Sequence, residues 1–477
     1  MKPLRPSKKW VLVAIGLLLA LLSLKIVLFL TAKPKIKVDY VAEYNRITRP
    51  TNCDSNDNAA PHYQQALDTF IQMPENLRVP FVDWPTDYND VYQRMLKEWL
   101  ASNSQSFEYF RIAAHRPYYW LERQASEDNN MFSIMTPELA PLRQLIEAVI
   151  WEAKLDVCKG QFQDAFEKIL DCYRAGLQKC RTPSFLMEQL VGTSFKKMAV
   201  SNALIIIDRT SIDSATLQLF QNALETEFYS DKHVPDIATE KLMFYDAIQR
   251  VFVDNGRGTG RLAWRAAYAF DVMCCEWTNI KMRLNCFVGP TRNETLQKIE
   301  KYFELCETLW TLTSWELRNK YPNYFTKIES LEKSNFLLDI LTISPQGISR
   351  PYYRTRSQTQ ALITILAIIR FRADNNQLPN TLDELVSSGY LRYIPMDPYS
   401  NGPLVYRLTK NNFTLYSVGE DFSDNGGVAK AGHVLMSQQL GMTSYTEQSD
   451  IVYWPVLRIE RLQRQKSEGN YRQLDDI

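Results

Sequence analysis

The histidines are the first side chains to consider for chemistry, because imidazole serves both acid–base catalysis and zinc binding. The chain has four of them, His62, His115, His233 and His433. None has the spacing of a zinc-hydrolase motif such as H-E-x-x-H, and no G-x-S-x-G nucleophile elbow occurs. A carboxylate pair, as in glycosidases, needs no local motif, so a cell-envelope polysaccharide-processing enzyme stays open as an alternative.

A glycine-rich segment is the second place to look for chemistry. Residues 254–261 read DNGRGTGR and combine three glycines with two arginines. Such a loop binds phosphate when a strand precedes it and a helix N-terminus follows it. The preceding residues, YDAIQRVFV, have a helical pattern instead. A mobile basic loop between helices is therefore the favoured interpretation, and a phosphate site is the alternative.

The cysteines leave two interpretations open. An even number in an exported domain permits disulfides, and no metal-type C-x-x-C pair occurs. Several also fall in helical patterns, where a buried free thiol serves as a small apolar residue. The eight are Cys53, Cys158, Cys172, Cys180, Cys274, Cys275, Cys286 and Cys306.

The strongest pattern in the chain is an apolar run from Trp10 to Ala32. At about 1.5 Å per residue, a helix of this length crosses a hydrocarbon core of about 30 Å. Lys25 lies close enough to the far end for its side chain to reach the headgroups. The alternative is a cleaved signal peptide, but Leu30-Thr31-Ala32 is a poor cleavage site. Residues 10–32 are therefore predicted to be a retained transmembrane anchor.

The charges beside this run indicate its orientation. Basic residues in 1–9 favour a cytoplasmic N-terminus, although Lys33, Lys35 and Lys37 partly offset them. We therefore predict a single-pass protein of the inner (cytoplasmic) membrane whose bulk is extracytoplasmic. Later apolar runs, 203–207 and 361–369, are too short to span a bilayer and are predicted to be buried parts of helices.

Composition bounds the rest of the chain. Its 477 residues are 45% hydrophobic and 23% charged, which fits a packed globular protein, and 17 glycines are few enough to favour helix. Lys and Arg number 55 against 54 for Asp and Glu, so the net charge is +1. Nucleic acid is therefore not an expected partner.

A helical hairpin is the clearest element of the region 38–347. Apolar residues from Leu142 to Val157 and from Phe162 to Leu177 each follow the spacing of one helix face, and Gly160 separates the two runs. The hairpin resembles a tetratricopeptide (TPR) unit in the placement of Ala153, Gly160 and Ala165. No period of about 34 residues repeats along the chain, which favours an irregular helical bundle.

Beyond Ser357 the pattern changes from helical to mixed. A helix is predicted over 357–373, followed by the turn Leu378-Pro379-Asn380. Thr381 and Glu384 form a capping box that starts a short helix, which Gly389 ends. Turn residues then precede two strands, 404–408 and 413–418, which are predicted to form a β-hairpin.

These features in this order resemble the globular part of the major pseudopilin (G-type) of bacterial type II secretion systems. The features are the Leu-Pro turn, the TLDEL helix, Asp397-Pro398, the LYSVG strand, the acidic glycine-rich loop GEDFSDNGG and SDIVYW. The resemblance covers roughly the last quarter of the chain. The whole chain also resembles a set of bacterial membrane proteins that place such a module after an N-terminal anchor and a helical region, as in the stretch DSNDNAAPHYQQA.

The resemblance implies a calcium site, because the acidic loop of these pseudopilins binds calcium. Transferred to this sequence, the candidate ligands are the carboxylates of Asp421, Asp424 and Asp450. Calcium prefers six to eight oxygen ligands, which short acidic residues supply. The chain departs from the family pattern by an insertion at 428–448, which puts the calcium site in doubt. The pilin-type helix directly before the fold is also absent, which argues against polymerisation. A solvated acidic turn is the alternative.

Together these observations predict a mainly α protein with a cytoplasmic N-terminus (1–9), an anchor (10–32), a helical extracytoplasmic domain (38–347), a pseudopilin-like α+β module (357–457) and a polar tail (458–477). The function expected is a membrane-tethered scaffold or interaction protein of the bacterial cell envelope, with protein partners there and no catalysis evident. One alternative is an accessory component of a type II secretion or pilus-like system. The sequence identifies no small-molecule ligand, and calcium is the one cofactor it raises.

Overall fold

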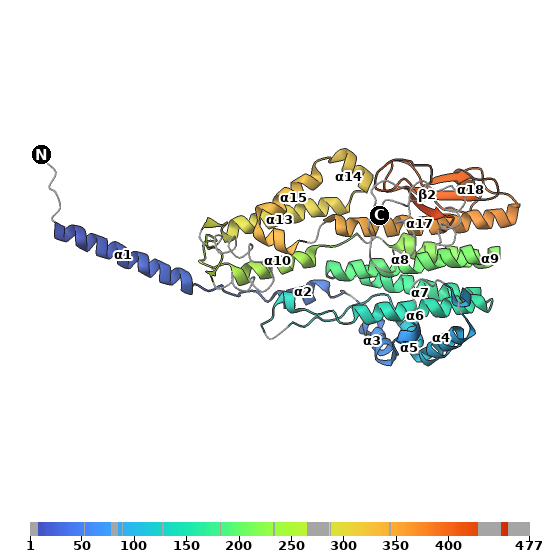
Figure 1. Cartoon of the computed structure of the whole chain (residues 1–477), viewed down its shortest axis with the longest axis horizontal. Coiled ribbons are helices and arrows are strands. Elements are labelled where there is room, and N and C mark those ends of the chain that lie inside the picture. The colour runs from blue at the N-terminus through green and yellow to red at the C-terminus, as the bar shows by residue number, and fades with distance from the viewer. Residues whose placement is uncertain are drawn as a thin grey trace.

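In the computed structural model the chain forms a mainly helical body with a small three-stranded antiparallel sheet. A single helix, α1 (Lys8–Thr31), projects away from one end of this body (Figure 1). The residues described are 8–51, 53–77, 84–87, 89–125, 128–181, 183–231, 234–264, 286, 288–342, 345–427 and 450–456.

Four shorter helices follow α1 and cover one side of the body. They are α2 (Tyr40–Thr48), α3 (Ala60–Thr69), α4 (Asp90–Ser102) and α5 (Ser104–Ala114). Asp39 caps α2 by accepting a hydrogen bond from the Ala42 amide, and Asn89 caps α4 in the same way through the Tyr92 amide. Short 3₁₀ turns lie at Ser55–Asp57, Glu75–Leu77, Pro85–Asp87 and Met131–Ser133.

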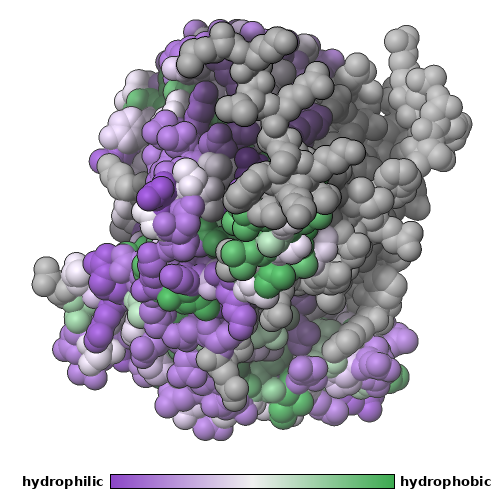
Figure 2. Space-filling view, turned by 90° about the vertical axis from the view of Figure 1, so that its left-hand side faces the viewer, coloured by the Kyte–Doolittle hydropathy of each residue, from purple (hydrophilic) through white to green (hydrophobic). Residues whose placement is uncertain are grey.

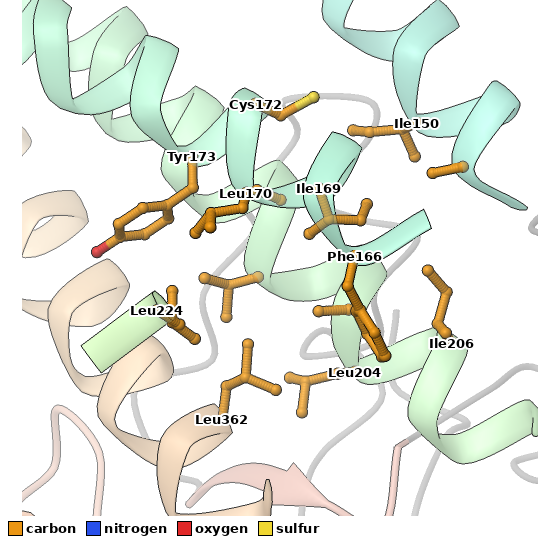
Figure 3. Close-up of a cluster of buried hydrophobic side chains, with 14 of the residues drawn as sticks. Ile150, Phe166, Ile169, Leu170, Cys172, Tyr173, Leu204, Ile206, Leu224 and Leu362 are labelled. Carbon is orange, nitrogen blue, oxygen red and sulfur yellow. The ribbon is translucent and has the colours of Figure 1, made fainter. Parts of the chain in front are cut away.

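The centre of the body is built from four longer helices. They are α6 (Leu139–Cys158), α7 (Phe162–Arg181), α8 (Leu186–Arg209) and α9 (Ser214–Ser230). The predicted hairpin is confirmed as α6 and α7, and Gly160 joins them with φ of +80°, a conformation that favours glycine. Side chains from α6, α7, α8, α9 and the later α17 meet in one apolar cluster, which contains Phe166, Leu204 and Leu362 (Figure 3).

The helix α8 has the length and apolar composition that a membrane crossing requires. Its most apolar stretch is 67% buried inside the body, as expected of a core helix. The apolar run 203–207 lies within α8, and the run 361–369 lies within α17 (Pro345–Asn375). Both were predicted to be buried parts of helices, and both belong to the main apolar core.

Two glycines let α7 and α8 approach backbone to backbone. A Cβ atom on Gly176 would lie 2.6 Å from the Gly192 carbonyl oxygen, and one on Gly192 would lie 2.8 Å from the Gly176 carbonyl oxygen. Two lysines, Lys179 and Lys196, are buried beside this crossing. The close approach therefore lies directly beside two buried cationic side chains.

A second apolar cluster lies nearer the α1 end of the body. It is built mainly from α10 (Ala238–Val251), α13 (Arg292–Trp310), α14 (Ser314–Lys320), α15 (Tyr324–Ser334) and α16 (Phe336–Leu341). The described cysteines Cys53, Cys158, Cys172, Cys180, Cys286 and Cys306 are all free thiols. Cys274 and Cys275 lie outside the described residues. The described part therefore follows the free-thiol interpretation.

The helix predicted over 357–373 is longer than expected. It begins at Pro345, twelve residues before the predicted start at Ser357. Proline fits the first position of a helix because its missing N–H would have no partner there. The apolar core is continuous from α8 and α9 through α17 to the sheet, across the predicted boundary between helical domain and C-terminal module.

The C-terminal sheet has the order β1-β2-β3 and is antiparallel throughout. The predicted hairpin corresponds to β1 (Val405–Leu408) and β2 (Phe413–Ser417), and SDIVYW supplies β3 (Ile451–Trp454). The short helix is α18 (Leu382–Ser387), and Thr381 caps it as predicted. The Glu384 carboxylate accepts from the Asn380 amide instead of the Thr381 amide, so the capping box is incomplete.

Candidate functional sites

The three aspartates predicted to bind calcium lie around one loop beside the sheet. Asp450 immediately precedes β3 and is fully buried, whereas Asp421 and Asp424 lie in the exposed loop after β2. Asn425 links two of them, because its amide N–H donates to Asp450 (3.1 Å) and its side-chain amide donates to Asp421 (2.9 Å). The structure therefore places the three residues in one loop region.

Each aspartate already accepts hydrogen bonds from the loop itself. Asp450 receives the Gly427 amide (2.7 Å) on its second oxygen. Asp424 receives the Gly426 amide (2.8 Å), the Tyr416 hydroxyl (2.8 Å) and Arg407 (2.7 Å). Burial raises the pKa of Asp424, but these donors outweigh it and hold that pKa below its ordinary value.

The three carboxylates do not converge on a shared point. In the described part of the chain, they are not among the groups whose ligand atoms lie within 4.8 Å of one another. Calcium binding would therefore require the loop to exchange amide hydrogen bonds for metal ligands. Calcium binding stays a prediction, and thermal unfolding with calcium and with chelator tests it. An unchanged Tm would remove the calcium hypothesis.

One group of three metal-ligand side chains does converge among the described residues: His115, Glu167 and Asp171. A guanidinium already occupies its centre, because Arg174 Nη1 lies 2.7 Å from Glu167 and 2.9 Å from Asp171. The hydrogen bond to Asp171 raises the pKa of His115. We interpret the group as a surface charge network, because Arg174 supplies the positive charge that a metal would bring.

A second charge network is buried between four segments of the chain. Tyr119 and Arg123 lie in the segment before α6, Glu138 precedes the first residue of α6, Lys179 lies on α7 and Glu188 lies in the first turn of α8. The side-chain amide of Asn45 on α2 fixes the backbone of Arg123, because it donates to the Arg123 carbonyl and accepts from the Arg123 amide, each at 2.8 Å. We call these five residues, Tyr119, Arg123, Glu138, Lys179 and Glu188, the buried charge cluster.

Arg123 is the centre of the buried charge cluster. Its Nη2 atom lies 2.6 Å from Glu138 Oε1 and 2.6 Å from Glu188 Oε2. The side chains of Arg123 and Glu188 are only 4% and 3% exposed, so water screens this pair little. Burial raises the pKa of Glu138, but the hydrogen bond from Arg123 and the charge of Lys179 lower it below the ordinary value.

Lys179 occupies the other side of the cluster without a close hydrogen bond. Its Nζ atom is 3.6 Å from Glu138, 3.7 Å from Glu188 and 3.4 Å from the centre of the Tyr119 ring. Burial outweighs the two glutamates and lowers the pKa of Lys179 to about 8. The amine is thus held by cation–π and longer-range charge interactions.

A small hollow of about 270 Å³, including its open mouth, borders the cluster. Three buried polar atoms along it have no hydrogen-bond partner among the described residues: Lys179 Nζ, Ser184 Oγ and Glu188 Oε1. A donor, a hydroxyl and an acceptor in one hollow can bind one small hydrogen-bonding molecule, of which water is the smallest. The arrangement stabilises a polar junction and offers little room for a larger substrate.

Sequence reasoning missed the whole buried charge cluster. Its residues come from distant parts of the chain, and only the fold brings them together. One local signal was present, because Lys179 continues the series Cys172, Ala175 and Gly176 at helical spacing. All four of these residues are buried, so α7 is buried on a wider face than its apolar stripe indicates. A lysine on such a face is expected to require a carboxylate partner.

Comparison with known proteins finds no match: no family model, no curated protein and no solved structure corresponds to this chain.

Proposed function

We propose that the protein is a membrane-tethered scaffold or interaction protein of the bacterial cell envelope. The observation that carries the proposal is the contrast between two helices of the same length. Both α1 and α8 have 24 residues and are rich in apolar side chains. The helix α8 buries its apolar side chains in the body, whereas α1 exposes them, as with Leu18 at 68% and Leu17 at 61%.

Exposure on this scale supports a non-aqueous environment around α1. Each large aliphatic side chain gains about 1.5–3 kcal/mol on leaving water. The exposed ones lie along the described length of the helix: Ile15, Leu17, Leu18, Leu19, Leu21, Leu22, Leu24, Ile26, Val27 and Leu30. A contiguous apolar surface of this kind marks a membrane or partner contact. Together with the length of α1, this favours a bilayer crossing with the body on one side.

The C-terminal module supports a second candidate, an accessory role in a type II secretion or pilus-like system. The order long helix, capped short helix and antiparallel strands is the order that the pseudopilin resemblance implies. The helix α17 is not free, however, because Gln358 donates to Ser201 on α8 and Arg370 donates to Gln221 on α9. Such an embedded helix favours a fixed recognition module over a polymerising subunit.

The buried carboxylate pair that bears on the polysaccharide-enzyme alternative is Glu138 and Glu188. Glycosidases need two carboxyl groups facing an open cleft that holds a sugar ring. Both glutamates instead direct an oxygen to Arg123, and their side chains are 10% and 3% exposed. This pair therefore favours a structural role.

Fractionation of the full chain tests the anchor. We expect the protein in the membrane fraction after an alkaline wash, and solubilised by detergent. Replacing Leu18 and Leu21 by arginine should abolish membrane retention, because each arginine near the centre of a span costs about 2.5–3.5 kcal/mol. Leu219→Arg is the matched control, since Leu219 is 57% exposed on α9 of the body. Intact wild-type protein in the soluble fraction would overturn the proposal.

Affinity purification from native membranes tests the interaction role. The scaffold proposal expects defined envelope proteins to co-purify in stoichiometric amounts with the full chain. Secretion-system components among them would favour the second candidate. A chain that purifies alone from gently solubilised membranes would remove both.

A further inference from the structure

The segment that joins α1 to the body is held by the glycine-rich loop 254–261. Pro34 forms an antiparallel β-bridge with Val253, and Lys37 forms an ion pair with Asp254. On the neighbouring α10, Gln249 accepts from the Lys37 and Val38 amides (3.0 and 3.1 Å) and donates to the Val38 carbonyl (2.8 Å). The position of the loop relative to the end of α1 is thus set by direct contacts.

The loop itself is built to hold its tip in one conformation. At its base, the Val253 amide donates to the Arg261 carbonyl (2.9 Å). At the start of α13, the amides of Arg292 and Asn293 donate to the carbonyls of Gly260 and Gly258. The glycines are needed for close packing, because a Cβ on Gly258 would collide with the Asn293 side chain at 2.1 Å. The loop carbonyls accept from the helix start, which differs from a loop that donates amides to phosphate.

Basic and apolar side chains are exposed together around this junction. Lys33 and Lys35 lie in the segment after α1, and Arg257 lies at the loop tip. None of these three forms an ion pair with another described residue, whereas Asp254 is neutralised by Lys37. Ile36 is 58% exposed, and Val288, which is 78% exposed, directly precedes Gly289, whose carbonyl accepts from Arg261 of the loop (2.6 Å). We call these five residues, Lys33, Lys35, Ile36, Arg257 and Val288, the juxtamembrane collar.

The position of the collar brings it to the level of the lipid headgroups. Lys33 and Lys35 follow the last residue of α1 by two and four positions, which is at most about 7 and 14 Å of extended chain. Arg257 lies four residues beyond Val253, which the bridge to Pro34 joins to the same segment. The helix α10, which leads into the loop, runs to the end of the body from which α1 leaves (Figure 1). Figure 2 views the molecule from that end, so that α1 points toward the viewer in front of a mostly hydrophilic described surface.

We propose that the juxtamembrane collar binds the anionic phospholipid headgroups of the bilayer that α1 crosses. This inference rests on the proposed anchoring of α1. Lysine and arginine ammonium and guanidinium groups pair with lipid phosphates, while Ile36 and Val288 enter the headgroup region. The bridge between Pro34 and Val253 and the hydrogen bonds between Gln249 and residues 37–38 connect the collar to the body. They thereby fix the orientation of the body on the membrane. The glycine-rich loop then serves as a structural support for a lipid contact.

The test uses the full chain in lipid nanodiscs. One set contains phosphatidylcholine alone, and the other adds phosphatidylglycerol. Hydrogen–deuterium exchange is followed for peptides covering 32–38 and 253–262. We expect the amides of the loop tip to exchange roughly tenfold more slowly with phosphatidylglycerol, and about 1 M salt to remove the difference.

Variants separate lipid binding from folding. Lys35→Glu with Arg257→Glu should abolish the lipid-dependent protection, because each basic group contributes about fivefold to surface binding. Arg372→Glu carries the same change of charge per site at the exposed end of α17 and should keep the protection. An unchanged Tm shows that the double variant is folded, because both replaced side chains are exposed.

The possible results distinguish the two proposals. Equal exchange in both lipids, for protein incorporated in the discs, would overturn lipid binding and leave the anchor intact. Protection that persists in high salt or in the double variant would also overturn it, because the basic groups would then contribute nothing. A chain that does not enter nanodiscs at all would overturn the anchor and this inference together.

Discussion

Two groups of carboxylates in this protein are stabilised by opposite means. In the loop beside the sheet, Asp450 is fully buried and accepts hydrogen bonds from two backbone amides of a nearby segment. In the buried charge cluster, Glu138 and Glu188 depend on one guanidinium, which lies 15 residues from Glu138 and 65 residues from Glu188. The first arrangement uses the dipoles of the chain itself, and the second uses a full opposite charge.

The difference determines what each group contributes to the fold. Backbone amides stay in place when a side chain is replaced, so the loop loses only the hydrogen bonds of the replaced group. Removing Arg123 would leave two buried carboxylates with only Lys179 to compensate them, at 3.6 and 3.7 Å. The buried charge cluster therefore ties α2, α6, α7 and α8 together more strictly than any contact within the acidic loop.

Arg123→Met should have the largest effect. It leaves Glu138 and Glu188 buried without their closest cation, and we expect a loss of about 3–5 kcal/mol in the free energy of unfolding. Urea unfolding of the full chain in detergent, followed by circular dichroism, measures it. Arg46→Met is the control, because the Arg46 side chain is 70% exposed in its ion pair with Glu43. Equal effects of the two replacements would contradict the distinction between the sites.

Lys179 should produce a pH dependence of stability that the loop does not have. The pKa of Lys179 falls to about 8 in the folded protein and returns to about 10.5 on unfolding. Between these values the unfolded chain binds the additional proton, so stability should rise with pH from about 8 to about 10. The gain is at most about 3 kcal/mol.

The matched variant for this pH dependence is Lys179→Met, which has a similar length and no titrating group. Unfolding free energies at pH 7.5 and pH 10 should differ more for the wild type than for the variant. An identical difference in both proteins would show that Lys179 keeps an ordinary pKa. Comparing the two proteins cancels the contributions of other lysines and tyrosines.

Asp450→Asn should have a smaller effect, of about 1–3 kcal/mol. Asparagine keeps the shape of the side chain and one acceptor oxygen, but its NH₂ group then faces the amide of Asn425 or Gly427. Amide exchange of residues 424–427 should accelerate along with the drop in Tm. If Tm falls while these amides stay protected, the two hydrogen bonds are not the reason for the stability of the loop.

The sequence predicted those parts of the fold that depend on local patterns. The α6–α7 hairpin, the turn at Gly160, the Thr381 cap and the β-hairpin all follow from spacing within a few residues. The predicted start of α17 was wrong, because the helix begins at Pro345 instead of Ser357, and proline is favoured in the first turn of a helix. The acidic loop was located from its residues, although its hydrogen bonds to Asp450 span 23 and 25 residues.

The buried charge cluster was beyond the reach of such patterns. Arg123 lies in a segment without helix or strand, and its partner Glu188 is brought near only by the α7–α8 crossing. That crossing depends on Gly176 and Gly192, whose close contact no periodicity indicates. The site that most constrains the body is therefore the one that the sequence least reveals.

Asp424→Asn should have the smallest effect of the series, below about 1 kcal/mol. Its ion pair with Arg407 is exposed, with side-chain exposures of 41% and 48%, so water and salt screen it. The pKa of Asp424 is lowered in the fold, so its contribution should be present at neutral pH and disappear as the pH falls through that value. A double-mutant cycle with Arg407→Gln, in low and in high salt, measures the pairwise interaction. A coupling as large as the effect of Asp450→Asn would mean that the exposed Asp424 contributes as much to stability as the buried Asp450. The contrast between compensation by backbone amides and by a guanidinium would then rest on the buried charge cluster alone.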